Sequence, residues 1–167
     1  MRLYLFRHAT AAPHGSSAQD ASRPLTKEGH EEALGVARGL KRLDLGITLV
    51  LTSPLVRARE TAQHAAILLG TKVELRELDA LQPEIEPRHT SLALRPFAGH
   101  ERVLCVGHEP HLSAWIGELV SGSGMRCQMK KAGVACLEIG RVPPPTGGST
   151  LRWLMTPKQL ILIGRAG

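Results

Sequence analysis

Aromatic residues and cysteines are scarce in this sequence of 167 residues. Phe, Trp and Tyr together make up 3% of the chain, so the core must be built mainly from Leu, Val, Ile and Ala. The three cysteines, Cys105, Cys127 and Cys136, are an odd number and lack the spacing of a metal site. Because Cys105 and Cys136 lie inside apolar runs, we expect them to be buried free thiols.

Long apolar segments are also missing. No run is long enough to span a bilayer, and the first residues, MRLYLFRH, contain neither an apolar segment of signal-peptide length nor a small-residue cleavage site. We therefore expect a cytoplasmic protein without a membrane partner. The length, with 43% hydrophobic and 22% charged residues, is typical of one globular domain spanning residues 1–167.

Basic residues outnumber acidic ones, with a formal net charge of +6 at pH 7. Such an excess is compatible with nucleic-acid binding, with an anionic substrate, or with neither. The basic residues form no continuous block, and few aromatic rings are present on which bases could stack. A nucleic-acid partner is therefore not expected.

Short apolar runs alternate with helical patterns along the chain. Strands are expected at residues 2–7, 47–52, 72–77, 102–107, 133–139 and 151–156. Helices are expected over 27–43 with Thr26 as N-cap, from Ser53–Pro54 to Gly70, over about 88–97, and from near Pro110. This order predicts an α/β fold, a single-domain three-layer sandwich. Its mostly parallel central sheet has about six strands, with helices on both faces. The last two strands, joined only by a loop, are expected to form an antiparallel edge.

Two histidines and two arginines occupy comparable places in this pattern. Arg7 and His8 end the first strand, His108 follows the fourth, and Arg57 lies in the first turn of the helix after the second. Ligands of open α/β sheets bind outside the carboxyl ends of the strands. The sequence therefore brings these four side chains to one edge of the sheet, where they form a cationic pocket.

Such a pocket favours phosphoryl chemistry. The guanidinium group of arginine matches phosphate oxygens, and a neutral imidazole is a good nucleophile toward phosphorus. Water would then hydrolyse a phosphohistidine intermediate. The sequence shows no P-loop and no carboxylate cluster for Mg²⁺, so neither a metal nor another cofactor is expected.

Simpler interpretations account for other motifs. An Arg–His pair alone also occurs where a strand end reaches solvent. HEPH at 108–111 has too short a spacing for two zinc ligands on one helix, and SGSGMR at 121–126 follows a helix, which indicates a helix exit rather than a phosphate loop. The remaining scattered histidines are interpreted as surface or structural residues: His14, His30, His64, His89 and His100.

Five segments together resemble one family in its order along the chain. They are LFRHATA (5–11), SRPLTKEGHEEA (22–33), LTSPLVRARETA (51–62), VGHEPHLSAWIGELVSG (106–122) and LRWLMTPKQL (151–160). The sequence is similar to the histidine phosphatase (phosphoglycerate mutase-like) superfamily, and most similar to its short SixA-type phosphohistidine phosphatases. The resemblance extends over nearly the whole chain.

The resemblance implies a role for each matching residue. His8 would be the catalytic nucleophile that becomes phosphorylated, Arg7 and Arg57 would bind the phosphoryl group, and His108 would complete the pocket. Arg23, in RPLT, would lie near the pocket mouth and contact the substrate.

The sequence departs from the family pattern in two places. Ala9 stands where many members have Gly, which matters little unless φ is positive. Many members also supply an acidic general acid from the region before the fourth strand. Asp79, Glu84 and Glu86 are candidates here, and the sequence does not choose among them.

The region before the fourth strand is short, which favours an open pocket and a phosphate presented on a protein surface. We therefore expect a metal-independent phosphatase that acts on phosphohistidine in a signalling or phosphotransfer protein, and a monomer. Two alternatives stay open: a phosphatase of a small phosphomonoester such as a phosphosugar, or a non-catalytic basic binding module.

Overall fold

A computed structural model describes residues 1–13, 20–122 and 125–165. Six strands in this part of the chain form one sheet of order β3-β2-β4-β1-β5-β6. The strands are β1 (Arg2–Arg7), β2 (Leu49–Thr52), β3 (Glu74–Glu77), β4 (Arg102–Gly107), β5 (Val134–Ile139) and β6 (Ser149–Met155). The α-helices are α1 (Lys27–Arg42), α2 (Val56–Leu69), α3 (Pro87–Ala93), α4 (His111–Ser121) and α5 (Pro157–Arg165), and short 3₁₀ turns cover η2 (Asp79–Leu81) and η3 (Arg95–Phe97).

The sheet is parallel except at the β5–β6 side. β1 pairs in parallel with β4, so that Arg7 lies opposite Gly107, while β5 runs antiparallel to both β1 and β6. β2 joins β4 and β3 in parallel. The predicted α/β fold, with a mostly parallel sheet and an antiparallel edge, is therefore confirmed. β1, β2 and β4 bring their carboxyl ends to the same edge.

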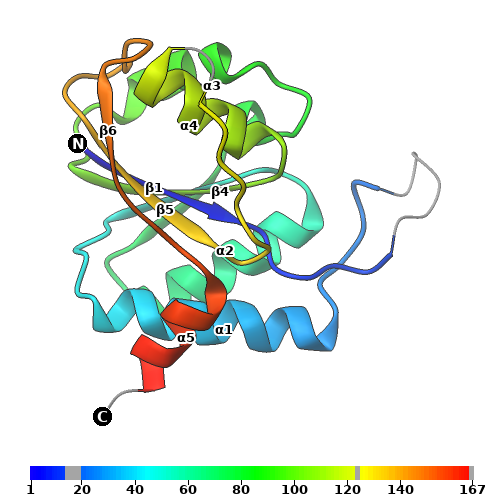
Figure 1. Ribbon diagram of the computed structural model, residues 1–167. Helices are drawn as coiled ribbons and strands as arrows, with labels where there is room; N and C mark the ends of the chain where they lie inside the picture. The colour runs from blue at the N-terminus through cyan, green and yellow to red at the C-terminus, as the bar shows by residue number, and fades with distance from the viewer. Residues whose placement is uncertain (14–19, 123–124, 166–167) are drawn as a thin grey trace.

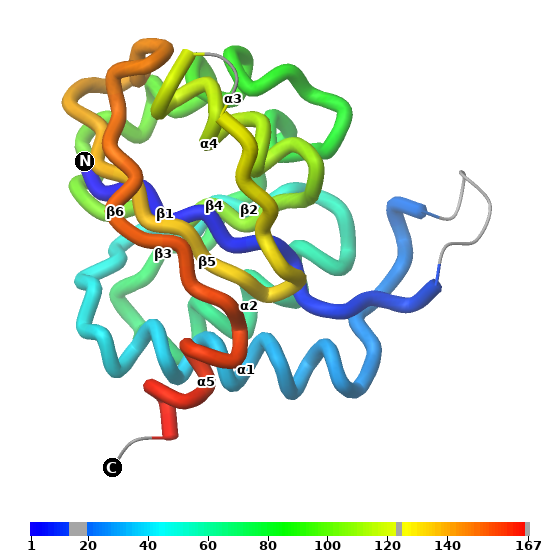
Figure 2. The backbone as a smooth tube through the Cα atoms, in the orientation of Figure 1, coloured from blue at the N-terminus to red at the C-terminus, as the bar shows by residue number. Residues whose placement is uncertain are grey.

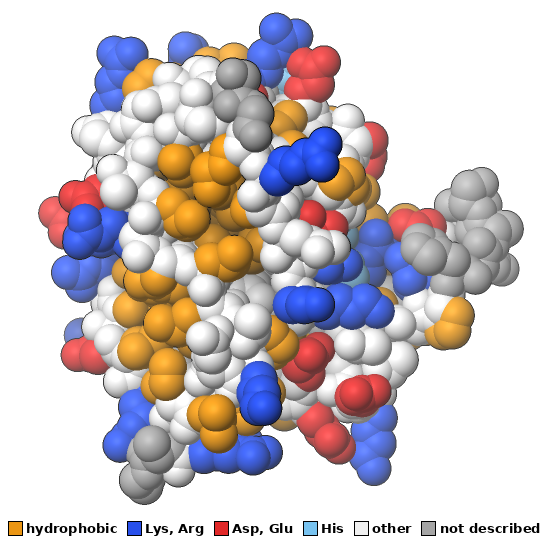
Figure 3. Space-filling view, in the orientation of Figure 1, with side chains coloured by type: hydrophobic (Ala, Val, Ile, Leu, Met, Phe, Trp, Pro, Cys, Tyr) orange, Lys and Arg blue, Asp and Glu red, His pale blue; other side chains and the backbone are white. Residues whose placement is uncertain are grey.

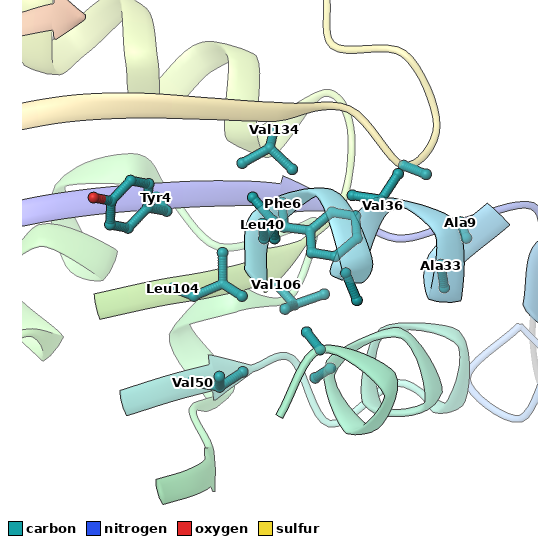
Figure 4. Close-up of a cluster of buried hydrophobic side chains, with 14 of the residues drawn as sticks. Tyr4, Phe6, Ala9, Ala33, Val36, Leu40, Val50, Leu104, Val106 and Val134 are labelled. Carbon is teal, nitrogen blue, oxygen red and sulfur yellow. The ribbon is translucent and has the colours of Figure 1, made fainter. Parts of the chain in front are cut away.

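Helices cover both faces of the sheet (Figures 1 and 2). α1, α2 and α5 pack on one face, and α3 and α4 lie on the other. Alternate residues of each strand supply the two cores because successive side chains point to opposite faces. Figure 4 shows the first core, in which Tyr4 and Phe6 of β1 pack with Val36 and Leu40 of α1. Leu3 and Leu5 enter the second core, beside Trp115 of α4.

The first turn of α1 packs closely against the chain that follows β1. Thr26 is the N-cap, as predicted, and its Oγ1 accepts a hydrogen bond from the Gly29 amide at 3.0 Å. A Cβ on Gly29 would collide with the carbonyl oxygen of Thr10. The missing side chain of Gly29 therefore lets the helix backbone support the segment that carries His8.

Two local predictions were wrong, and one helix was missed. α2 begins at Val56 with Leu55 as N-cap, so Ser53 and Pro54 lie before the helix instead of capping it. The predicted helix over 88–97 is divided into α3 and η3. The sequence analysis also missed α5, although Thr156 and Gln159 form a reciprocal cap there: Gln159 Oε1 accepts from the Thr156 amide at 2.8 Å, and Thr156 Oγ1 accepts from the Gln159 amide at 3.4 Å.

The cysteines are consistent with the expectation from composition. Cys105 and Cys136 are buried, and all three cysteines are free thiols. In the described ranges, no helix has both the length and the apolar character needed to cross a membrane.

Candidate active site

The structure places the four predicted residues in one pocket of about 360 Å³. Arg7 ends β1, His8 follows it, Arg57 lies in the first turn of α2, and His108 follows β4. The side chains of His8, Arg57 and His108 are buried, and that of Arg7 is half-buried. Figure 3 shows Lys and Arg side chains gathered beside histidine on the side of the molecule to which β1 points. Arg23 lies in the same pocket wall, where the resemblance placed it.

Hydrogen bonds define which nitrogen of His8 is available. Nδ1 lies 2.7 Å from the carbonyl oxygen of Ala9, which is only an acceptor, so the proton is on Nδ1. Nε2 therefore carries the lone pair, and it accepts a hydrogen bond from Arg57 Nε at 3.3 Å. The atom that remains basic is the one that points to the arginine.

Both pocket histidines are neutral at physiological pH. The pKa of His8 is lowered to about 4: burial is the largest cause, the bond to Ala9 opposes it, and the charges of Arg57, Arg7 and Arg23 add to the lowering. Burial likewise lowers the pKa of His108 to about 2, with smaller contributions from His8 and Arg57. A neutral His8 with an unprotonated Nε2 is the form that attacks phosphorus.

Two buried polar atoms of the pocket residues have no hydrogen-bond partner within the described chain. They are Arg7 Nε and His108 Nδ1. One other nitrogen of each side chain is engaged: Arg7 Nη1 donates to the Met129 carbonyl oxygen at 2.7 Å, and His108 Nε2 lies 2.8 Å from Ser53 Oγ. Buried polar atoms are almost always satisfied, so unpartnered ones indicate that a ligand completes the site. Sequence reasoning placed Ser53 at a helix start and so missed its contact with His108.

Asp20 joins two arginines across the pocket. Its carboxylate accepts from Arg57 Nη2 at 3.1 Å and from Arg23 Nε at 2.7 Å. Burial raises the pKa of Asp20, but the charges of Arg57 and Arg23 lower it more, so the net shift is downward and the carboxylate is ionised. The sequence analysis did not single out Asp20. The signal available in the sequence was that Asp20 lies three residues before Arg23.

The acid candidates named from the sequence lie outside the pocket. Asp79, Glu84 and Glu86 are exposed, and none of them belongs to the pocket lining formed by the described residues. The two carboxylates that do line it are Asp20 and Glu109. Glu109 directly follows His108 in HEPH, a motif that the sequence analysis tested only for zinc.

The other histidines lie elsewhere. His30 and His64 are half-buried and bond to each other at 2.9 Å between α1 and α2, His89 is exposed on α3, and His14 falls outside the described residues. His111 is buried, with Nε2 2.9 Å from Thr90 Oγ1. Among residues 1–13, 20–122 and 125–165, no group of three or more His, Cys, Asp or Glu side chains is arranged to hold a metal ion.

Sequence comparisons connect this geometry with known proteins. The model of the histidine phosphatase superfamily (branch 1) matches residues 3–86. An uncharacterised protein of Picosynechococcus sp. is 35% identical over 165 residues, covering 96% of this chain and 99% of the relative. Phosphohistidine phosphatase SixA of Escherichia coli is 28% identical over 162 residues, which is 96% of either chain.

Solved structures share the fold. The protein histidine phosphatase SixA complexed with tungstate has a TM-score of 0.83 at 28% identity, covering 96% of this chain and 99% of that one. The α-ribazole phosphatase of Shigella flexneri has a TM-score of 0.64 at 20% identity, covering 94% and 97%. The second likeness concerns the fold alone.

Proposed function

Because this chain belongs to the histidine phosphatase superfamily, we propose that it is a metal-independent phosphatase in which His8 is the catalytic nucleophile. The observation that carries the proposal is the combination of an unprotonated His8 Nε2, which accepts from Arg57, and two unpartnered buried atoms in the same pocket. The family implies a hydrolase of phosphorylated substrates. Here the pocket supplies both the nucleophile and the anion-binding groups for that reaction.

In the first step, His8 Nε2 attacks phosphorus and the bond from phosphorus to the leaving atom breaks. The Ala9 carbonyl keeps the Nδ1 proton in place and stabilises the positive charge that develops on the imidazole. Arg57 Nε, which lies against Nε2 in the free protein, is positioned to bind an oxygen of the phosphoryl group. In the second step, water attacks the phosphohistidine and phosphate is released.

Arg7 and His108 bind the transferring phosphoryl group. Arg7 Nε donates to one oxygen while Nη1 stays bonded to the Met129 carbonyl, which fixes the guanidinium plane. His108 Nδ1 donates to another oxygen when the Ser53 hydroxyl donates to Nε2 and so keeps the proton on Nδ1. Such preorganised donors stabilise charge on the equatorial oxygens as phosphoryl transfer proceeds.

The proposed substrate is a phosphohistidine in a signalling or phosphotransfer protein. The similarity to SixA over nearly the full length of both chains supports this proposal. The segment between β3 and β4, residues 78–101, also supports it, because it contains only the short elements η2, α3 and η3. The fold alone does not select the substrate, since an α-ribazole phosphatase has it too.

Trapping of the phosphoenzyme tests the mechanism. The wild-type protein and the variants His8→Ala and His89→Ala are mixed briefly with labelled phosphosubstrate in EDTA and then quenched. We expect an acid-labile, base-stable label on the wild type and on His89→Ala, whose changed histidine is exposed on α3, and none on His8→Ala. Normal turnover by His8→Ala would contradict the mechanism.

A substrate panel tests the specificity. A phosphohistidine protein, phosphosugars and phosphoglycerate are compared at matched concentrations, and the proposal predicts the highest kcat/KM for the phosphohistidine protein. Preference for a small phosphomonoester would favour the first alternative. Salt-dependent nucleic-acid binding without hydrolysis of any aryl phosphate would favour a basic binding module.

A further inference from the structure

The pocket contains two carboxyl groups, and their contacts differ. Asp20 is bonded to the guanidinium groups of Arg57 and Arg23 and is held as an anion. Glu109 is bonded to a neutral group: Ser113 Oγ, one helical turn later in α4, donates to its Oε1 at 2.8 Å. The Asp20 carboxylate orients the two arginines, whereas the Glu109 carboxyl group forms no direct ion pair among the described contacts.

Glu109 also lies where a leaving group would exit. His8, Arg57 and His108 are buried, so a phosphoryl group bound to them directs its leaving group toward the less buried part of the wall. Half-buried Glu109 belongs to that part, and it also lines an adjoining groove with Pro110 and Cys127. Glu109 is thus shared by the phosphate pocket and the groove that opens from it.

The direction in which the pKa of Glu109 is shifted suits a proton donor. Burial raises the pKa of its carboxyl group above the ordinary value, while the Ser113 bonds and the charge of Arg7 oppose this without cancelling it. Paired carboxyl groups whose surroundings shift their pKa values in opposite directions are typical of sites that divide acid and charge-stabilising roles. The shift of Asp20 is downward and that of Glu109 is upward.

The charged and titratable groups around Glu109 come from three directions. Arg7 approaches from the end of β1, and His108 precedes Glu109 in the chain. Cys127 and Arg126 line the groove on its other side, and Lys131 lies across the pocket. Among these groups, Arg7 is the one whose charge lowers the pKa of Glu109.

We propose that Glu109 is the general acid that protonates the leaving group, an inference that rests on the proposed phosphatase function. As His8 Nε2 forms its bond to phosphorus, the bond from phosphorus to the leaving nitrogen or oxygen breaks. The electron pair of the leaving atom takes the proton of the Glu109 carboxyl group. Glu109, now a carboxylate, then accepts a proton from the water that attacks phospho-His8; the N–P bond breaks and its electron pair returns to Nε2.

A series of leaving groups tests this role. The wild type, Glu109→Gln and the control variants Glu31→Gln and Glu86→Gln are compared on 4-nitrophenyl, phenyl and benzyl phosphate, in order of increasingly poor leaving group. General acid catalysis contributes about 10²–10⁴-fold and matters most for poor leaving groups. We expect Glu109→Gln to lose at least about 100-fold in kcat/KM on benzyl phosphate and little on 4-nitrophenyl phosphate. The controls, which change exposed carboxylates, should stay near wild type.

The pH profile gives a second readout. In the wild type, kcat/KM for benzyl phosphate should fall as pH rises through the raised pKa of Glu109, and this limb should vanish in Glu109→Gln. An equal loss on all three substrates, or an unchanged pH profile, would overturn the acid role while leaving the His8 mechanism standing. Absence of turnover by the wild type on every substrate would overturn both.

Discussion

At the scale of single residues, His8 depends on the backbone of its own neighbour. The Ala9 carbonyl holds Nδ1, and the Ala9 amide donates to Thr61 Oγ1 at 3.2 Å. Thr61 in turn donates to the Arg57 carbonyl oxygen at 2.8 Å, one turn earlier in α2. The orientation of the nucleophile and the position of Arg57 are therefore linked through the main chain of Ala9 and the buried hydroxyl group of Thr61.

The titration of His8 is predicted to lie well below that of free histidine. An NMR titration of the imidazole signals should show a midpoint near the pKa of about 4, against about 6.5 for an unperturbed histidine. Arg57→Met should raise the midpoint because a nearby positive charge is removed, yet leave it below the unperturbed value because burial is the larger cause. A wild-type midpoint near the unperturbed value would contradict the buried, neutral nucleophile.

The lowered pKa of His8 also makes the free energy of unfolding depend on pH. Between pH 6.5 and pH 4 the unfolded chain binds a proton at His8 that the folded chain does not. The contribution of neutral His8 to the free energy of unfolding is therefore fully present above pH 6.5 and declines as pH falls toward 4. His108 and His111, whose pKa values burial lowers to about 2 and about 4, act in the same direction.

Sequence reasoning identified the site residues that lie at strand ends within motifs. It missed the site residues whose roles depend on contacts formed only in the folded chain. Arg7, His8 and His108 follow strands whose apolar pattern is plain, so their meeting could be predicted. A serine at position 53 could either cap a helix or bond to His108. Only the direction of the backbone after β2 decides between these two roles. Glu109 could not be selected because burial of one carboxyl group is a property of the folded surface.

At the scale of elements, the approach of α1 to the segment after β1 is a packing requirement. The Thr26 cap starts the helix, and Gly29 lets its first turn lie against the Thr10 carbonyl. Thr10 is also held from α1, because its amide donates to Glu32 Oε2 at 3.3 Å. The helix thereby supports the chain that follows His8, on the side away from β1.

Gly29→Ala is predicted to disturb both stability and activity. The added methyl group must displace the Thr10 backbone, and overpacking of this kind costs about 1–3 kcal/mol. We expect a lower free energy of unfolding in a denaturant titration and a lower kcat, because the shift is transmitted to His8. Gly99→Ala is the matched control, since a Cβ there meets nothing within 4 Å. Equal behaviour of the two variants would contradict the packing role of Gly29.

Elements were predictable where periodicity was strong. β1 and β4 have the bounds expected for their apolar runs, residues 2–7 and 102–107. α5 was missed because its pattern is short and follows a strand directly, although the Thr156–Gln159 capping box and Pro157 at the first helical position mark its start. Its Leu160 is buried against α1, a contact that becomes visible only once the sheet has brought the two helices together.

At the scale of the whole molecule, the pocket joins segments from three neighbouring strands, so an anion bound there should stabilise the fold. A ligand that binds only the folded state adds RT ln(1 + [L]/Kd), about 2.7 kcal/mol at one hundred times Kd. We expect inorganic phosphate to raise Tm relative to chloride at equal ionic strength. The rise should be much smaller in Arg57→Met, and an equal rise in both proteins would indicate general salt stabilisation instead of binding at the pocket.

The large exposed hydrophobic residues are spread over several elements. Ile67, Leu75, Leu92, Leu154 and Leu162 lie on α2, β3, α3, β6 and α5, respectively. Such scattered single residues are normal at a protein surface and do not define an interface. The proposal of a monomer therefore stands as one that sedimentation can test.

The position of β1 in the sheet also orders events during synthesis of the chain. β1 precedes both of its partner strands along the chain, β4 at residues 102–107 and β5 at residues 134–139. Its consecutive apolar residues stay unpaired until β4 and β5 have been synthesised. Contacts between segments so far apart in the sequence form slowly. His8 is thus synthesised well before β4 and β5, so nascent chains that end before β4 should lack the pocket that surrounds His8.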